Sequence, residues 1–222
     1  MEKLSVDIEA IAKNAIRDVF RTDTSKPGFI HIDLGKESSS SELRATMVAL
    51  KKELSSYTKA TYDRPLSYHW LVRFDQQVNT PFHVDNAANQ SFLMLGYEPT
   101  PIQSELYLGD YHKYARECID APKNYLKDFT PVFENNHEHL KPYITKVDTL
   151  SNNSYSIVLI NNSVPTNHKE TLGTFHKATM RSQDFSKERV VNSMIMNMLS
   201  EHEEALNEPD EQRFITTSEI SK

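Results

Sequence analysis

Two His-x-Asp pairs are the first feature of this sequence that could do chemistry. They are His31-Ile32-Asp33 and His83-Val84-Asp85. Successive side chains of a β-strand point to opposite faces, so residues two apart lie on the same face. An imidazole and a carboxylate with this spacing can therefore take neighbouring positions around a metal ion.

The two pairs differ in their surroundings. His31 and Asp33 lie in a short extended segment between two helical patterns, next to apolar packing residues, so we interpret them as the polar face of an edge strand. His83 and Asp85 follow a strand and a turn, in a region of many short extended segments. We therefore favour His83 and Asp85 as metal ligands.

His176 offers a third ligand, because it lies in a short strand that follows the very apolar segment 155–160. Two histidines and one carboxylate form the facial triad that holds Fe(II) and leaves coordination positions open. Thirteen residues further on, Arg189 begins the last apolar strand. A guanidinium group pairs bidentately with a carboxylate, so Arg189 fits the distal end of a dicarboxylate co-substrate.

The order of His-x-Asp, a distant His and an Arg on the last core strand resembles the 2-oxoglutarate/Fe(II)-dependent dioxygenase superfamily. The likeness covers about residues 68–198. It implies a double-stranded β-helix, or jelly roll, and an enzyme that uses O2 to hydroxylate or oxidise a small molecule, an amino acid or a peptide. It also implies that His83, Asp85 and His176 bind Fe(II), and that Arg189 binds the C5 carboxylate of 2-oxoglutarate.

The sequence departs from the pattern of that superfamily at two points. Such enzymes often have Ser or Thr two residues after the Arg, where this chain has Val191, with Ser193 further on. Arg181 lies only five residues after His176 and competes with Arg189 for the same role. Arg73, on the strand before the triad, is a further candidate for contact with 2-oxoglutarate or substrate, against an interpretation as a structural ion pair.

Other residues of similar chemistry were weighed against the triad. His168 could replace His176 as the distal ligand, although its neighbours indicate a loop. His137-Glu138-His139 has the H-x-H spacing of cupin metal sites, but its polar flanks favour a solvated turn. The single cysteine, Cys118, can form no internal disulfide or cysteine cage, so we interpret it as a packing residue and expect any metal to be held by His and carboxylates.

Two alternatives to the oxygenase stay open. The first is a cupin-like metalloenzyme that does not use 2-oxoglutarate, and the second is a non-catalytic jelly-roll binding module with structural histidines. Arg189 separates the first from the favoured reading, because only a dicarboxylate co-substrate requires it. A measurement of the metal content of the protein separates the second alternative, the binding module, from both metalloenzymes.

Two amphipathic helices precede the candidate ligands. Apolar residues recur at helical spacing over 4–20, and a turn at Lys26-Pro27-Gly28 leads to an alternating strand at 29–34. Ser39 and Glu42 form a capping-box pattern before a second helix that runs to Tyr57. The resemblance implies that these are support helices packed on the sheet.

From about residue 68 the sequence has the rhythm of a sandwich or barrel. Short runs rich in aromatic and branched residues alternate with turn residues, at 68–74, 81–84, 91–97, 143–150, 155–160, 174–180 and 189–196. Residues 106–119 predict a strand running into a short helix, and 119–131 a loop. We therefore predict a mainly β domain over 1–199, with helical support at 4–57 and a jelly-roll core at 68–198.

Charge and composition limit the classes of partner that this chain is expected to bind. The chain has 222 residues and a formal net charge of −6, but the segment 200–222 carries seven acidic residues against Arg213 and Lys222. The remaining body is nearly neutral and has no basic stripe, so we expect no nucleic-acid partner. The start of the chain mixes charges with apolar residues, so we expect no signal peptide or membrane anchor, and a cytoplasmic protein.

The acidic segment 200–222 has few apolar side chains. We expect it to form a frayed helix or a disordered tail. In the alternative, Phe214 and Ile215 anchor it across the support helices or across the seam of a homodimer.

Overall fold

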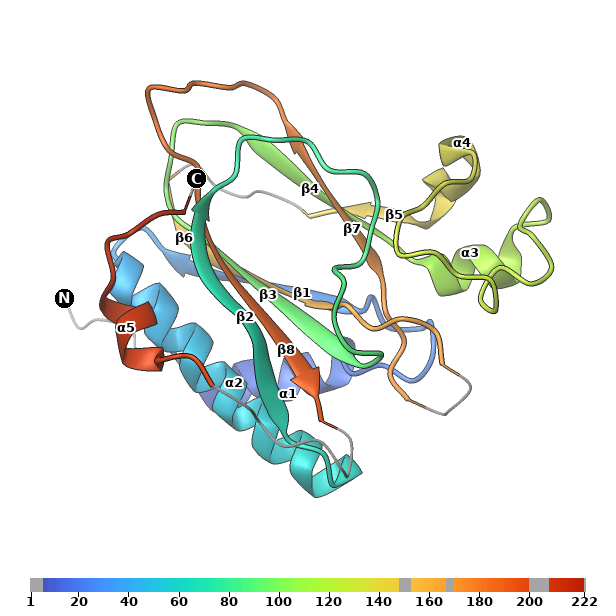
Figure 1. The fold of residues 1–222 in the computed structure, drawn as a ribbon, viewed down its shortest axis with the longest axis horizontal. Helices are drawn as coiled ribbons and strands as arrows, with labels where there is room; N and C mark the ends of the chain where they lie inside the picture. The colour runs from blue at the N-terminus through green and yellow to red at the C-terminus, as the bar shows by residue number, and fades with distance from the viewer. Residues whose placement is uncertain (1–5, 148–152, 167–169, 200–207, 222) are drawn as a thin grey trace.

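The computed structural model describes residues 6–147, 153–166, 170–199 and 208–221. Two antiparallel sheets form its centre, with strand orders β1-β6-β3-β8-β2 and β5-β4-β7. Figure 1 shows helices against one side of the larger sheet and the smaller sheet on the other side. The fold is thus mixed and rich in sheet.

The three inner strands of the larger sheet are buried on both faces, which explains their continuous apolar runs, whereas its edge strands are partly exposed. Its strands are β1 (Phe29–Gly35), β2 (Leu66–Asp75), β3 (Ser91–Tyr97), β6 (Tyr155–Asn161) and β8 (Val190–Met198). Alternate residues of β3 serve different cores: Phe92 and Met94 pack toward the helices, whereas Leu93 and Leu95 pack toward the smaller sheet. The larger sheet therefore separates two apolar cores.

Helices α1 (Ile8–Asp18) and α2 (Ser40–Tyr62) cover one face of that sheet. Ser39 is the N-cap of α2, where its Oγ accepts a hydrogen bond from the backbone N–H of Glu42. Gly96 allows α2 to approach β3 closely, because a Cβ atom there would lie 2.6 Å from the sulfur of Met47. The predicted support helices and capping residue are confirmed, with α2 extending to Tyr62.

The smaller sheet packs on the opposite face. Its strands are β4 (Ser104–Gly109), β5 (Ile144–Lys146) and β7 (Phe175–Met180), and Leu106 and Leu108 join the second core. The segment around 80–84 is not a regular strand, but it lies beside β7 through a bridge between His83 and His176. This segment brings the first candidate ligands to the smaller sheet.

A cluster of aromatic side chains lies at one end of the molecule, beneath α3 (Tyr111–Glu117) and α4 (His137–Leu140). In Figure 1 these two short helices lie together, away from α1 and α2. The predicted strand-to-helix passage corresponds to β4 followed by α3. The segment 137–139 is largely exposed to solvent, as expected, but it forms the first residues of the short helix α4, which Leu140 anchors with no exposed surface.

The described part of the acidic segment is packed rather than disordered. Helix α5 (Glu211–Thr216) buries Phe214 in the core shared by α2 and the larger sheet. The buried guanidinium of Arg44 donates hydrogen bonds to the carbonyl oxygens of Ile215 and Thr217. This packing across α2 is the alternative stated above, and the expected frayed or disordered tail is wrong for these residues.

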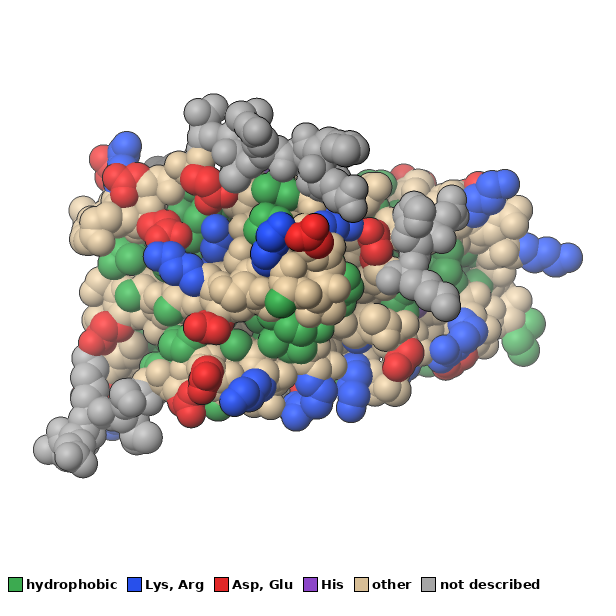
Figure 2. Space-filling view, turned by 90° about the horizontal axis from the view of Figure 1, so that it is seen from below, with side chains coloured by type: hydrophobic (Ala, Val, Ile, Leu, Met, Phe, Trp, Pro, Cys, Tyr) green, Lys and Arg blue, Asp and Glu red, His purple; other side chains and the backbone are tan. Residues whose placement is uncertain are grey.

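The surface of the helical side carries both signs of charge. Figure 2 shows Lys and Arg interspersed with Asp and Glu over the described part of this face. No described helix combines the length and the apolar character needed to cross a membrane.

Candidate metal centre

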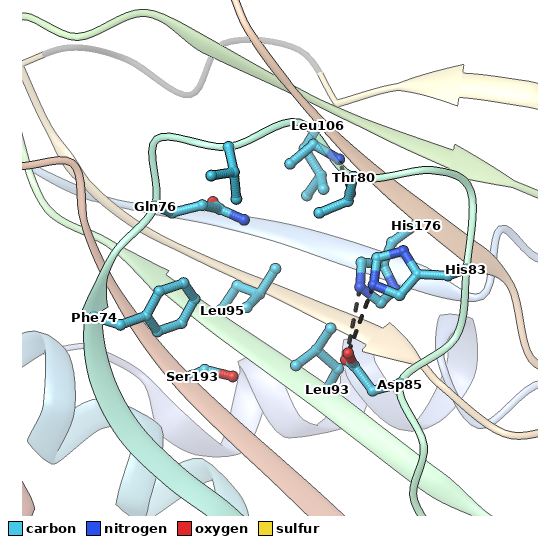
Figure 3. Close-up of a pocket in the computed structure, with 12 residues that line it drawn as sticks. Phe74, Gln76, Thr80, His83, Asp85, Leu93, Leu95, Leu106, His176 and Ser193 are labelled. Carbon is cyan, nitrogen blue, oxygen red and sulfur yellow. Dashed lines mark hydrogen bonds and ion pairs between the residues drawn. The ribbon is translucent and has the colours of Figure 1, made fainter. Parts of the chain in front are cut away.

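His83, Asp85 and His176 converge in the structure, with one ligand atom from each lying within 4.8 Å of the others. Nε2 of His83 lies 3.6 Å from Oδ1 of Asp85, and Nε2 of His176 lies 3.6 Å from Oδ2. Figure 3 shows both rings directed toward the carboxylate from the same side. The described residues thus bring together the two histidines and the carboxylate expected from the sequence.

Backbone pairing sets the positions of the two histidines. The N–H of His83 donates to the carbonyl of His176 at 3.0 Å, and the N–H of His176 donates back at 2.8 Å. Residues that exchange both hydrogen bonds are directly opposite each other, so their side chains share one face. Their ring centroids are accordingly 4.1 Å apart.

A second hydrogen bond orients the His83 ring. Its Nδ1 lies 2.9 Å from the carbonyl oxygen of Pro81. A carbonyl oxygen can only accept, so Nδ1 carries the proton and Nε2 keeps its lone pair. Such a bond to the outer nitrogen is how proteins fix the tautomer of a metal-binding histidine.

Asn162 holds the backbone of Asp85 in place. Its Oδ1 accepts from the N–H of Asp85 at 2.8 Å, and its Nδ2 donates to the carbonyl oxygen of Asp85 at 3.3 Å. The same amide group donates to Oγ of Ser91 at 2.8 Å, and Asn162 has no exposed surface. Asn162 was not singled out from the sequence, where it is one member of an Asn-Asn-Ser run without a pattern.

Electrostatics favour the metal-binding forms of His176 and Asp85. Burial lowers the pKa of His176 to about 4, which keeps the imidazole neutral at neutral pH. Burial raises the pKa of the Asp85 carboxyl, but the neighbouring His83 and His176 outweigh it and the net pKa is lowered. For His83, burial lowers the pKa, but Asp85 and the Pro81 carbonyl outweigh it and the net pKa is raised.

A cavity of about 190 Å³ between the sheets adjoins the triad. Apolar side chains dominate its lining, which includes Phe74, Leu93, Leu95, Leu106 and Ala178, together with the polar side chains of Gln76, Thr80 and Ser193. Figure 3 shows Phe74 and Gln76 across the cavity from the three ligands. The centre is therefore open on one side to a small, mostly apolar space.

Arg189 lies between the sheets, beyond this cavity. Its Nε donates to Oγ of Ser104 at 2.9 Å, and its guanidinium carbon lies 4.7 Å from the ring centroid of Tyr97. Ser104 and Leu106 are two residues apart on the same face of β4, and Leu106 lines the cavity. Arg189, which contacts Ser104, therefore lies two residues along β4 from the wall of the cavity. Arg189 is 3% exposed, and among the described residues no carboxylate pairs with it. Within the described residues its guanidinium is thus a buried cation that contacts a hydroxyl, a carbonyl oxygen and an aromatic ring but no carboxylate.

The other two candidate arginines lie elsewhere and already have partners. Arg181 is exposed and pairs with Glu105 at 2.6 Å. Arg73 faces the helical side, where its Nε pairs with Glu98 at 3.1 Å. Among the described residues, no Lys or Arg lines the cavity.

The remaining candidates are separate from the triad. His31 and Asp33 lie on β1, at an edge of the larger sheet, as the edge-strand interpretation expects. His168 lies outside the described residues. Gln76 and Thr80 line the cavity but were not predicted from the sequence, although Gln76 continues the alternation of β2 after Phe74.

Comparison of the sequence with models of protein families and with curated proteins gives no match.

Proposed function

We propose that this protein is a non-haem Fe(II) oxygenase that uses 2-oxoglutarate and O2 to hydroxylate or oxidise a small-molecule, amino-acid or peptide substrate. The observation that carries the proposal is the convergence of His83, Asp85 and His176 beside a cavity between two sheets. Location in the cytoplasm and the absence of a nucleic-acid partner remain predictions.

The strand order supports a jelly-roll core. From β2 the chain passes to the segment 80–84 beside the smaller sheet, returns to the larger sheet at β3, and then forms β4 and β5 in the smaller sheet. It then alternates, with β6 in the larger sheet, β7 in the smaller and β8 in the larger. Counting the segment 80–84 beside β7, this gives the eight strands in two sheets of a jelly roll. We infer a double-stranded β-helix on this ground.

The donor set fits Fe(II). Two imidazole nitrogens and one carboxylate on one side are the ligands of a facial-triad iron site, which leaves positions for a chelating co-substrate and O2. Fe(II) would supply the activation of O2, while the chain provides the ligands and a largely apolar space. The Pro81 carbonyl and Asn162 hold His83 and Asp85 in place.

The cavity suits one small co-substrate. Its volume of about 190 Å³ is below the roughly 300–1,000 Å³ of pockets for drug-sized ligands. The buried cation of Arg189 lies beyond the described lining of the cavity, so Arg189 would bind a dicarboxylate held at the triad only if its contact with Ser104 opened. The primary substrate would approach from the open side of the cavity.

One observation favours the alternative of a cupin-like metalloenzyme without 2-oxoglutarate. The described lining of the cavity contains no cation, and Tyr97 and Ser104 already contact Arg189. In that case the polar side chains of Gln76, Thr80 and Ser193 would orient a neutral substrate.

Anaerobic titration separates the two functions. We expect 2-oxoglutarate added to the Fe(II)-loaded protein to produce the visible charge-transfer absorption of a chelated 2-oxo acid, and O2 then to yield succinate. Asp85→Ala should abolish both signals, and His31→Ala, in the other His-x-Asp pair, should change neither. Fe(II) binding without any absorption change or succinate would favour the cupin-like enzyme.

A further inference from the structure

A second group of metal-ligating side chains lies at the end of the molecule formed by α3 and α4. One ligand atom each of Cys118, Asp120 and His139 lies within 4.8 Å of the others. Nε2 of His139 is 3.8 Å from Oδ2 of Asp120. The group is separate from the candidate iron centre and shares no residue with it.

Local structure explains why these residues meet. Cys118 is the C-cap of α3, and the turn that follows is closed by a hydrogen bond from the N–H of Ala121 to the Cys118 carbonyl at 3.1 Å. Asp120 lies within this turn. Leu140 has no exposed surface and anchors α4 in the aromatic cluster, which places its neighbour His139 against the turn.

The Tyr114 hydroxyl is a second, independent observation. Tyr114 has no exposed surface, and within the described residues its Oη has no hydrogen-bond partner. The backbone N–H of Cys118 donates to the Tyr114 carbonyl at 3.0 Å, so the two residues are one helical turn apart and their side chains share a face of α3. A buried phenol hydroxyl without a hydrogen-bond partner destabilises the fold unless a neighbouring group accepts a hydrogen bond from it. A metal-bound thiolate or carboxylate would be such an acceptor.

We propose that Cys118, Asp120 and His139 form a second metal site that binds Zn²⁺. A thiolate, an imidazole and a carboxylate are all zinc ligands, with bonds of about 2.0–2.3 Å. In a tetrahedral site with such bonds, neighbouring ligand atoms lie roughly 3.4 Å apart. Nε2 of His139 and Oδ2 of Asp120 are 3.8 Å apart, which is close to this distance. The exposed Asp120 carboxylate can close the remaining gap, and water takes the fourth position. The thiol proton leaves to solvent on binding.

Ligand chemistry separates this site from the first one. Thiolate is a soft ligand that selects zinc over harder ions, whereas the other centre offers only nitrogen and oxygen. Zinc here would join the turn after α3 to α4, above the aromatic cluster that contains Phe82 and Phe175. Phe82 and Phe175 directly precede His83 and His176 in the chain. Zinc at the second site would therefore stabilise the aromatic cluster on which these two histidines rest.

Cobalt(II) gives a direct test, because a thiolate ligand adds a near-ultraviolet charge-transfer band that nitrogen and oxygen ligands do not. We expect the reduced, metal-free chain with His83→Ala and His176→Ala to bind one Co²⁺ with this band, and Zn²⁺ to remove the band by displacement. Cys118→Ser in that background should abolish it, and His139→Ala should weaken binding by about 10-fold or more.

His137→Ala is the matched control, because His137 is an exposed histidine on the same helix but outside the group. It should leave the band and the affinity unchanged. Zn²⁺ should also raise the melting temperature of the wild-type chain more than that of Cys118→Ser. The proposal is overturned if the folded chain shows no thiolate band, or if His139→Ala binds Co²⁺ as tightly as the control.

Discussion

His83 and His176 are directly opposite each other in an antiparallel pair, and each backbone N–H donates to the other's carbonyl, at 3.0 and 2.8 Å. This exchange fixes both imidazoles on one face, with Nε2 of each 3.6 Å from the Asp85 carboxylate. The metal centre therefore depends on the pairing of two distant segments.

Removal of either histidine should impair this centre. We expect His83→Ala and His176→Ala each to weaken Fe(II) binding by about 10-fold or more, because each removes one of three ligands. Anaerobic binding titration measures the effect, with His31→Ala as the control that keeps wild-type affinity. Wild-type affinity in both folded ligand variants would exclude the triad.

Asn162 should act as a positioning residue. Because it bonds both the N–H and the carbonyl of Asp85, Asn162→Ala should weaken Fe(II) binding by about 10-fold without removing a ligand. Asn161→Ala is the matched control, since Asn161 is equally buried but donates to the carbonyl of Val19 on the helical side. Equal losses of metal affinity in the two variants would indicate a general loss of packing instead.

The arginines should differ in their effect on 2-oxoglutarate. If Arg189 binds the distal carboxylate, Arg189→Ala should raise the apparent dissociation constant by roughly 30-fold, equivalent to about 2 kcal/mol. Arg181→Ala should have little effect, because Arg181 is exposed and paired with Glu105. A titration of 2-oxoglutarate that gives the reverse ranking would transfer the role to Arg181.

The tail should stabilise the domain. Phe214 is 5% exposed in the core under α2, so Phe214→Ala should cost about 3 kcal/mol of unfolding free energy. Deletion after Ser200 should lower the melting temperature as well, because it also removes the carbonyl partners of the buried Arg44. Glu219→Ala, at an exposed position, should be neutral. An unchanged melting temperature after deletion would contradict this role.

His112 should make stability depend on pH. Burial first and Arg21 second lower its pKa to about 4, from an ordinary value of 6.5. Between these values the unfolded chain binds more protons, so stability is lost as pH falls from about 6.5 toward 4. We expect His112→Gln to reduce the loss between pH 7 and pH 5 by about 2 kcal/mol, measured by urea unfolding. An identical pH profile would show that His112 is solvated.

Local patterns in the sequence determined much of this fold. The apolar periodicity of α1 and α2, the cap at Ser39 and the alternation of the β-strands follow from neighbours in the chain, which is why their positions could be predicted. The two His-x-Asp pairs were visible for the same reason. Their different surroundings were enough to favour His83 and Asp85 over the pair on β1.

Only the tertiary structure decided which distant residues meet. The pairing of His83 with His176, the position of Arg189 beyond the cavity, and the meeting of Cys118 with His139 depend on contacts between segments far apart in the sequence. The burial of Phe214 is of the same kind, because six helical residues with few apolar side chains gain a core only from α2 and the larger sheet. Periodicity describes one segment at a time, whereas a metal site or a cavity forms from several segments packed together.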